Sequence, residues 1–171
     1  MKKVWITLII IAVATSALFA QEKNAKTMAQ ERLTYMKDNL SLSSKEAQNF
    51  WSVYEQYLNE EIKALDTYRK NLEKQGIKLG APGTNKEIID KLSDKQLTYL
   101  QDQKFELRKN LLNLETTYYK KYKTLLTPKH LQDLYNLEYK YKRVVTQKRK
   151  EVNKDVKREN PIPMNPGKKK R

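Results

Sequence analysis

The sequence predicts an all-α protein, and three observations lead to that class. With the exception of Pro128, the 4 Gly and 5 Pro residues lie in two stretches, "GIKLGAPGTN" (76–85) and "NPIPMNPGKKKR" (160–171). The rest of the chain consists largely of good helix formers, and no segment has the alternating pattern of a strand. Apolar residues recur instead at spacings of three and four. We therefore expect four helices, two of them long.

The two long helices determine the expected shape. Helices of about 30–40 residues are roughly 45–60 Å long, which is too long for a compact ball of this size. Each carries a single apolar stripe, which a thin layer or a dimer can bury. We expect an elongated, antiparallel, hairpin-like layer that is curved and dimeric.

Residues 1–20 have the pattern of a secretory signal peptide. Lys2 and Lys3 precede the apolar run "VWITLIIIAVATSALF" (4–19), and Ala20 provides a small residue at the expected cleavage point. The alternative is an uncleaved anchor, but the run is shorter than the about 20 apolar residues that span a bilayer. We therefore expect export and a mature chain that begins at residue 21.

Four helices follow in order. The first runs from 23 to 39, the second from 44 to 75, the third from 84 to 125, and the fourth starts after Thr127 and ends before Pro161. The capping-box pattern "TNKE" (84–87) opens the third helix. The expected apolar stripes are Ala29, Leu33, Met36 and Leu40; Ala47, Phe50, Trp51, Tyr54, Leu58, Ile62, Leu65, Tyr68 and Leu72; Ile88, Ile89, Leu92, Leu100, Leu107, Leu111, Leu114, Tyr118, Tyr122 and Leu125; and Leu131, Leu134, Tyr141, Val145 and Val152.

The pentapeptides "LSSKE" (42–46) and "LTPKH" (126–130) open the second and fourth helices. Ser43 and Glu46 fit a capping box, in which each side chain accepts a hydrogen bond from the other residue's backbone N–H. Thr127 is a good N-cap, and Pro128 follows at the first helical position, where its missing N–H has no cost. Leu42 and Leu126 precede the two caps, and Leu126 can form a hydrophobic staple with Leu131.

A third pentapeptide of this kind, "LSDKQ" (92–96), lies in the predicted third helix. The apolar stripe runs without interruption from Ile89 to Leu100. We therefore interpret "LSDKQ" as an accidental match inside that helix. The alternative is a short break of the helix at Ser93.

Two segments resemble the Spy/CpxP family of periplasmic proteins, namely "KDNLSLSSKEAQNFWSVYEQY" (37–57) and "LLTPKHLQDLYNLEYKYKR" (125–143). That family carries two L-T-x-x-Q motifs, each at a helix start. In its Bacteroidetes-type members the first motif continues as E-A-x-x-F-W-x-x-Y, which "EAQNFWSVY" (46–54) matches through Ala47, Phe50, Trp51 and Tyr54. The resemblance covers about residues 30–145.

The chain departs from the family pattern at three positions. Ser43 replaces Thr, and Glu46 and His130 occupy the two Gln positions. Glu46 still completes a capping box, whereas His130 does so poorly. The resemblance implies an exported, dimeric, cradle-shaped helical protein that acts as an ATP-independent chaperone for unfolded or misfolded envelope proteins. The alternative function that the resemblance implies is an envelope-stress or metal-responsive sensor that acts on a membrane-bound signalling partner.

No catalytic constellation is present in the sequence, so we expect no enzyme and no cofactor. There is no Cys and only one His, His130. A transition-metal site needs several His, Cys or carboxylate ligands at defined spacing, so we interpret His130 as a polar residue at a helix start and expect no metal. The absence of Cys also excludes disulfides and a lipidated cysteine.

The basic charge is concentrated near the C-terminus. Without Lys2 and Lys3 the chain carries 33 basic and 20 acidic residues, a net charge of +13, of which residues 139–171 contribute +10. We expect one helical domain over 21–158 and a disordered basic tail over 159–171 that can touch anionic envelope surfaces. Nucleic acid is the alternative partner, and the signal peptide argues against it.

Tyrosine is abundant, with 11 residues that include those of "TTYYKKYK" (116–123) and "LYNLEYKYK" (134–142). These rings can serve as the edges of a thin core. Beside Lys they can also form a surface that binds apolar and acidic segments of unfolded chains. The sequence leaves both interpretations open.

Overall fold

A computed structural model describes residues 25–80 and 85–159, together with their side chains up to residue 148. Within these ranges every regular element is a helix, which confirms the all-α class. The elements are an N-terminal helix (25–39), α2 (Ser44–Lys74), α3 (Lys86–Ile89), α4 (Asp94–Leu125) and α5 (Pro128–Glu159). The predicted signal peptide, and the predicted tail except for its first residue, lie outside the described residues.

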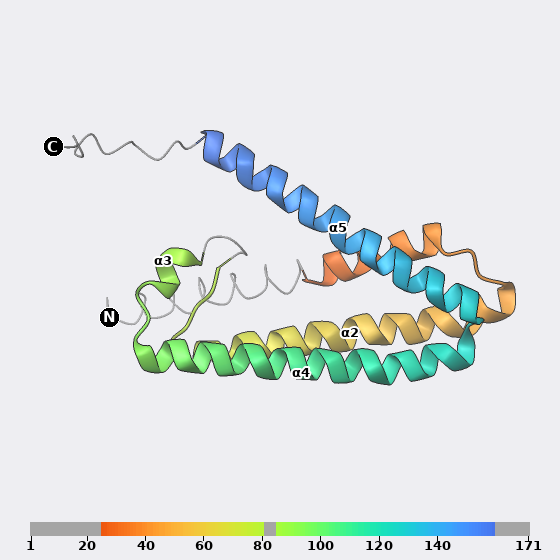
Figure 1. Ribbon diagram of the computed structural model, residues 1–171, viewed down its shortest axis with the longest axis horizontal. Helices are drawn as coiled ribbons and strands as arrows, with labels where there is room; N and C mark the ends of the chain where they lie inside the picture. The colour runs from red at the N-terminus through yellow and green to blue at the C-terminus, as the bar shows by residue number, and fades with distance from the viewer. Residues whose placement is uncertain (1–24, 81–84, 160–171) are drawn as a thin grey trace, which may run out of the picture.

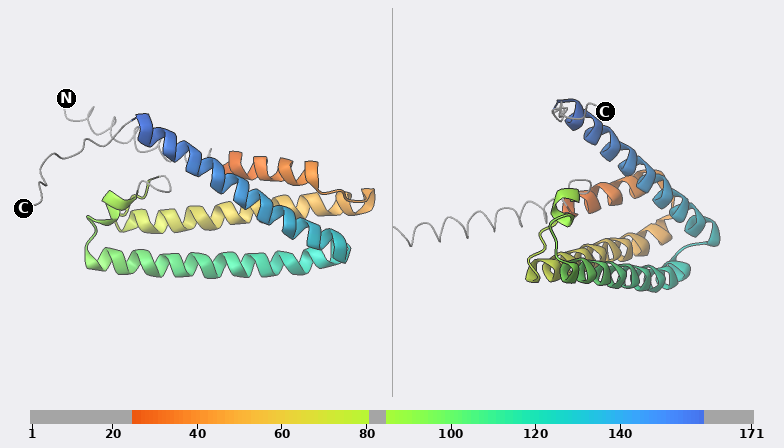
Figure 2. Two further views of the ribbon diagram at one scale, coloured as in Figure 1. Left: turned by 45° about the horizontal axis from the view of Figure 1, so that its top comes forward. Right: turned by 60° about the vertical axis from the view of Figure 1, so that its left-hand side comes forward.

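The helices α2 and α4 lie side by side along most of their length and run in opposite directions (Figure 1). The N-terminal helix and the first half of α5 pack at one end of this pair, where α2 begins and α4 ends (Figure 2). Farther along, α5 diverges from the pair, and its second half extends away from it. The short helix α3 lies at the opposite end.

The prediction of a single helix over 84–125 is wrong. The chain leaves the helical conformation after Asp90, and Ser93 has extended backbone dihedrals, φ −68° and ψ 159°. Ser93 and Gln96 form a complete capping box, so "LSDKQ" is a helix start and the alternative of a break at Ser93 is correct. The apolar stripe hid the break because Ile89 and Leu92 pack against the same small cluster as Leu100.

The predicted capping box "TNKE" begins at Thr84, which lies outside the described residues. The N-cap of α3 is Asn85, and its side chain makes no capping hydrogen bond to the helix. Its carboxamide oxygen instead accepts a hydrogen bond from the backbone N–H of Gly80, at 2.7 Å. Asn85 therefore joins Gly80 to the start of α3.

Two separate clusters of buried side chains form the core of the described residues. The large cluster lies where the N-terminal helix, α2, α4 and α5 meet, and it contains Leu33, Met36, Leu40, Phe50, Tyr54, Leu58, Tyr118, Tyr122, Leu126 and Leu134. The small cluster lies at the other end and contains Leu72, Ile77 and Leu100. Between them Ile62, Leu65, Leu107 and Leu111 are only half-buried. The predicted stripes are thus buried at the two ends of the α2/α4 pair and not at its middle.

The end of α2 is a Schellman motif, which accounts for Gly76. Gly76 has a positive φ of 72°, a conformation that L side chains rarely adopt. Its N–H donates to the carbonyl of Glu73, and the N–H of Ile77 donates to the carbonyl of Leu72. The motif brings Ile77 back towards Leu72, and both residues belong to the small cluster.

Candidate functional site

The first pentapeptide forms the capping box that its sequence predicts. The backbone N–H of Glu46 donates to Ser43 Oγ at 3.4 Å, and the backbone N–H of Ser43 donates to Glu46 Oε2 at 3.1 Å. The Ser43 hydroxyl also donates to Glu46 Oε2, at 2.7 Å. These bonds satisfy amides at the start of α2 that have no partner within the helix.

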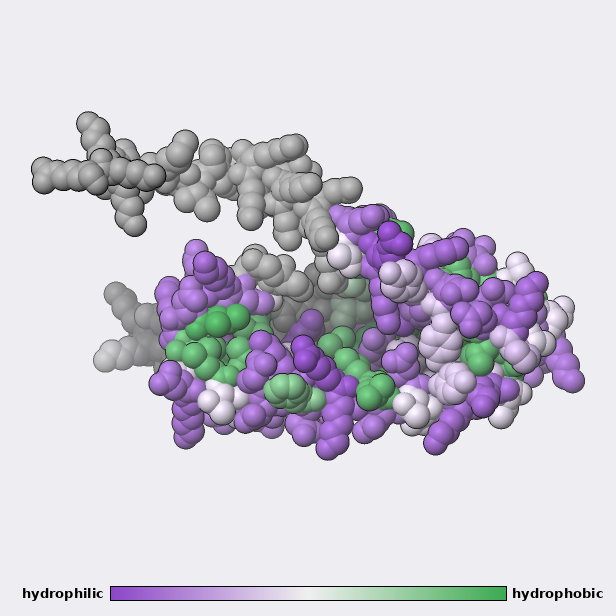
Figure 3. Space-filling model, in the orientation of Figure 1, coloured by the Kyte–Doolittle hydropathy of each residue, from purple (hydrophilic) through white to green (hydrophobic). Residues whose placement is uncertain are grey.

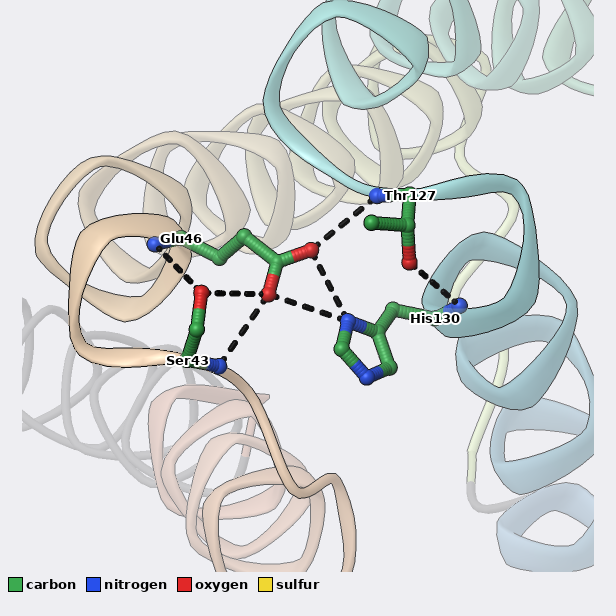
Figure 4. A network of polar contacts seen from close by, with 4 residues as sticks. All are labelled: Ser43, Glu46, Thr127 and His130. Atoms are coloured by element: carbon green, nitrogen blue, oxygen red, sulfur yellow. Dashed lines mark hydrogen bonds and ion pairs between the residues drawn. The ribbon is translucent and has the colours of Figure 1, made fainter.

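The carboxylate of Glu46 also reaches the second pentapeptide, 84 residues away in the chain (Figure 4). Its Oε1 accepts the backbone N–H of Thr127 at 3.0 Å, and His130 Nδ1 lies 2.8 Å from the same oxygen. The backbone N–H of His130 donates to Thr127 Oγ1 at 3.3 Å. Glu46 therefore supplies to α5 the acceptor that a Glu or Gln at position 130 would supply in an ordinary capping box.

Glu46 and His130, the last residues of the first two pentapeptides, are thus complementary to each other. A Gln at position 46 has one side-chain acceptor oxygen, whereas Glu46 uses both oxygens for donors from two helices. His130 can donate from Nδ1 to this carboxylate in its neutral or its charged form. The hydrogen bond from His130, then those from Thr127 and Ser43, lower the pKa of Glu46 from 4.5 to about 2. The carboxylate is therefore ionised at neutral pH.

The remaining residues of the two predicted motifs also gather at this end of the molecule. Phe50 and Tyr54 are fully buried in the large cluster, Leu126 is buried with them, and Leu42 packs against its edge. Trp51 is half-buried, with Lys37 Nζ 5.8 Å from its ring centre. Ala47 is half-buried, and Pro128 is exposed as the first residue of α5. The structure thus places the whole predicted set at one corner.

The last residue of the third pentapeptide, Gln96, also closes its own capping box and contacts a neighbouring segment, at the opposite end of the α2/α4 pair. Gln96 Oε1 accepts the backbone N–H of Ser93 at 3.1 Å, which closes the capping box of α4. Gln96 Nε2 donates to the carbonyl of Gln75 at 3.0 Å, just after the end of α2. Gln suits position 96 because the neighbouring group is a hydrogen-bond acceptor, the carbonyl of Gln75. At Glu46 the neighbouring groups of the second pentapeptide are donors.

A buried polar network lies at the same end of the molecule as Glu46, and it was not predicted from the sequence. Arg32 Nε donates to both carboxylate oxygens of Glu138, at 3.1 and 3.0 Å, and Arg32 Nη1 donates to Glu61 at 2.7 Å. The hydroxyl of Tyr54 donates to Glu138. The side chains of Arg32 and Glu138 are 11% and 10% exposed. The network joins the N-terminal helix, α2 and α5.

One sequence signal could have identified this network. Arg32 lies between Ala29 and Met36 on the apolar face of its helix, and Glu138 lies between Leu134 and Tyr141 on the apolar face of α5. A charged residue at a buried position needs a partner of opposite charge. Burial alone would lower the pKa of Arg32, but the neighbouring Tyr54, Glu138 and Glu61 outweigh burial and raise it.

A cavity of about 30 Å³ adjoins the network. It is lined by Arg32, Tyr54, Tyr57, Glu115, Tyr122, Leu134, Tyr135, Glu138 and Lys142. The Tyr122 hydroxyl is the one buried side-chain polar atom of the described residues without a hydrogen-bond partner. Burial raises the pKa of Tyr122 far above its ordinary value, so this hydroxyl is a neutral donor. The volume suits a water molecule or two and is too small for an organic ligand.

These polar groups hold helices together. Arg32 and Glu138 are hydrogen-bonded to each other and to Glu61 and Tyr54. The carboxylate of Glu46 is hydrogen-bonded to Ser43, Thr127 and His130. Across the described ranges no three His, Asp or Glu residues are grouped so that they could hold a metal ion. Of the helices described, none has the length and apolar character that crossing a membrane requires.

Comparison with known proteins gives no relative. No protein-family model, curated protein or solved structure matches this chain.

Proposed function

We propose that the chain is an exported, ATP-independent, chaperone-like protein that holds unfolded or misfolded envelope proteins in the periplasm. It is not an enzyme in this proposal, and it needs no cofactor or metal. The proposal includes the Spy/CpxP-like assignment, with its dimeric and cradle-like arrangement. The resemblance of residues 37–57 and 125–143 to that family and the signal-peptide pattern of residues 1–20 support it.

The observation that carries the proposal is the pairing of exposed aromatic rings with cations. Phe105, Tyr119 and Tyr139 are 57%, 39% and 64% exposed. The side chain of Arg108 lies over the ring of Phe105, that of Lys123 over Tyr119 and that of Arg143 over Tyr139, at 5.5–5.9 Å from the ring centres. Each pair presents an apolar surface and a positive charge within one helical turn.

Such pairs suit weak binding to many unfolded chains. A misfolded client exposes apolar and aromatic side chains, which can pack against the rings. Its acidic residues can bind the adjacent cation. The rings and cations lie on helices that are already formed, so binding a client requires no folding of this surface. No chemical step and no nucleotide is required.

The test is suppression of aggregation by the purified mature protein, residues 21–171, without ATP. We expect substoichiometric to equimolar protein to suppress light scattering by a chemically denatured client, and to do so less well at high salt, because salt screens the cations. The triple variant Phe105→Ser, Tyr119→Ser, Tyr139→Ser should lose most of this effect while its helical circular dichroism stays unchanged. Absence of suppression at every ratio contradicts the proposal.

The alternative is a sensor that acts on a membrane-bound regulator of the envelope stress response, with or without a metal signal. The observation in its favour is α5, whose second half extends from the packed end of the molecule and carries many basic residues (Figure 1). If the chain is a sensor, its deletion should change expression of stress genes in the cell, while the pure protein leaves client aggregation unaffected. The aggregation assay therefore separates the two functions. Repeating the assay with a protein that lacks residues 146–171 measures how much this basic segment contributes to client binding.

A further inference from the structure

The N-terminal helix (25–39) lies against the start of α2 and the first half of α5 and covers side chains of both (Figure 2). The ring of Tyr35 lies 5.3 Å from that of Tyr141 on α5, and the Tyr141 hydroxyl donates to the carbonyl of Met28 at 3.3 Å. On α2, the ring centre of Tyr57 lies 5.6 Å from the guanidinium of Arg32. We call the covered surface the α2/α5 groove, and its residues are Trp51, Tyr57, Glu61, Glu138 and Tyr141.

The N-terminal helix occupies this groove with one apolar face. Leu33 and Met36 are 4% and 0% exposed, and Leu40, directly after the helix, is 5% exposed. Spacings of three and four residues place these side chains on one side of a helix. Glu31 and Asp38, on its other side, are exposed. The groove therefore has the form that accepts an amphipathic helix.

The groove is acidic as well as apolar. Glu138 accepts hydrogen bonds from Arg32 Nε at 3.1 and 3.0 Å, and Glu61 accepts one from Arg32 Nη1 at 2.7 Å. Two carboxylates among apolar groups favour a cation between them, and a guanidinium can donate to both. The groove is thus complementary to an amphipathic helix that carries a basic residue within its apolar face.

The frame of the groove is held by contacts in which the N-terminal helix takes no part. The capping box of Ser43 and Glu46 closes the start of α2. Glu46 joins α2 to α5 through the N–H of Thr127, and the hydroxyl of Tyr54 on α2 donates to Glu138 on α5. If the N-terminal helix leaves, α2 is therefore still capped and α5 is still attached to it.

The N-terminal helix is also connected in a way that lets it leave as a unit. Residues 40–43, which join it to α2, are not helical, and no described element precedes it. When it leaves, Arg32 and its two carboxylate partners all return to water, so no unpaired charge remains buried. The cost lies in the apolar surface that is exposed, and a second helix of the same character can cover that surface again.

We propose that the N-terminal helix is a displaceable segment, and that an amphipathic helical segment of a client, with a basic residue in its apolar face, takes its place in the α2/α5 groove. This inference rests on the proposed function and names a class of client segment and a second surface for it. Phe105, Tyr119 and Tyr139 are exposed while the N-terminal helix is in place, so the groove adds to these rings and does not cover them.

The first test uses a fluorescent peptide with the sequence of residues 25–40 as the probe and the mature protein, residues 21–171. The chain's own helix competes with the peptide at an effective concentration on the order of 1 mM, so we expect weak, saturable binding. Leu33→Ala in the protein weakens its own helix, and binding of the natural peptide should tighten by roughly tenfold or more. A peptide with Arg32→Glu should bind at least about tenfold more weakly, because it brings a third carboxylate to Glu61 and Glu138.

The matched control for the protein is Leu112→Ala. Leu112 is 63% exposed on α4, outside the groove, so this variant should bind the peptide as the natural protein does. Equal binding of the peptide by Leu33→Ala and Leu112→Ala overturns the inference. Equal affinity for the natural and the Arg32→Glu peptide overturns the assigned role of the two carboxylates in choosing the segment.

The second test fixes the N-terminal helix in the groove. The natural sequence has no Cys, so the double variant Met28→Cys, Tyr141→Cys can be joined specifically by a short bismaleimide across a pair that is in contact. Cross-linking should abolish peptide binding and reduce suppression of aggregation, each relative to the same variant before cross-linking. Lys63→Cys, Thr67→Cys, one turn apart on the exposed side of α2, is the control, and its cross-linking should change neither.

The outcomes separate this inference from the proposed function. Peptide binding that survives the cross-link places the peptide elsewhere and overturns the inference. A cross-linked protein that loses peptide binding and still suppresses aggregation fully also overturns it, while the proposed function through the exposed rings stands. Absence of suppression by the protein before cross-linking contradicts the proposed function itself.

Discussion

The two ends of the α2/α4 pair each contain a capping box, and yet they differ in the size of the core that they bury. At one end four helices meet around a cluster of ten buried residues, and Glu46 joins the starts of α2 and α5. At the other end the cluster has three buried residues, and Gln96 joins the start of α4 to the carbonyl of Gln75. Both joining residues occupy the last position of a Leu-Ser-x-x-Glu/Gln pentapeptide.

The difference shows that a capping box can serve as a tertiary contact as well as a helix start. The hydrogen bonds from backbone N–H groups have the same lengths in the two capping boxes, Ser43 with Glu46 and Ser93 with Gln96. What differs is the group that the neighbouring element offers, two donors at Glu46 and one carbonyl at Gln96. The four-helix end adds a buried ion pair and a large apolar core, so we expect it to determine the global stability of the chain.

The largest effect is expected from breaking the buried network at the four-helix end. Arg32→Ala leaves the carboxylate of Glu138 buried without its cation, which costs about 3–5 kcal/mol of the free energy of unfolding. The exposed Lys109, whose nearest carboxylate oxygen is at 4.0 Å, is the control, and Lys109→Ala should cost less than about 1 kcal/mol. Urea unfolding followed by circular dichroism measures both. Equal midpoints for the two variants contradict this account.

Core truncation should act differently at the two ends. Leu134→Ala removes a residue that is 1% exposed in the large cluster and should lower the free energy of unfolding by about 2–5 kcal/mol. Leu72→Ala removes a residue that is 2% exposed in the small cluster, and we expect its main effect to be local opening of the end near α3. Hydrogen exchange resolved by segment distinguishes the two results. Faster exchange of α5 in Leu72→Ala would show that the two ends unfold together.

A smaller effect is expected at the hydroxyls around the cavity. Tyr54→Phe removes a buried hydrogen bond to Glu138 and should cost about 1–3 kcal/mol. Tyr122→Phe removes a hydroxyl without a protein partner and should change stability by less than about 1 kcal/mol. Each variant lacks one tyrosine hydroxyl group. Thermal unfolding of the two variants therefore compares how much each hydroxyl contributes to stability. A larger loss for Tyr122→Phe than for Tyr54→Phe would indicate a well-bound water that uses this hydroxyl.

The smallest effect is expected at the shared carboxylate, and its pH dependence identifies it. The pKa of Glu46 is lowered to about 2 in the folded chain from an ordinary value of 4.5, so the folded state favours the ionised form. Its contribution to stability is therefore complete above pH 4.5 and is lost as the pH falls towards 2. Glu46→Gln should be less stable than the natural chain at pH 7, and the difference should shrink with acid.

Its matched control is Gln96→Glu at the other end. This variant loses the donor to the Gln75 carbonyl and keeps the acceptor for Ser93, so a small loss without the same acid dependence is expected. Urea midpoints measured from pH 7 to pH 3 compare the two variants. A constant difference between Glu46→Gln and the natural chain over that range contradicts the assigned role of the carboxylate.

The sequence by itself determined the helical class and most helix boundaries. Spacings of three and four placed Leu33, Met36, Phe50, Tyr54 and Leu134 on buried faces, because helix periodicity depends only on local geometry. Ser43 and Thr127 marked helix starts for the same reason, since the capping bonds lie within four residues. The break at Ser93 was equally local, but the uninterrupted apolar stripe argued against it.

Only the tertiary structure decided which distant groups meet. Nothing in the pentapeptides indicates that Glu46 accepts a hydrogen bond from the amide of Thr127, or that Arg32 pairs with Glu138, 106 residues away. These contacts depend on how α5 crosses the N-terminal helix and α2, which is fixed by the sum of many apolar contacts. Once that packing forms, the exclusion of water makes each buried donor and acceptor costly to leave without a partner, and this cost determines the pairs.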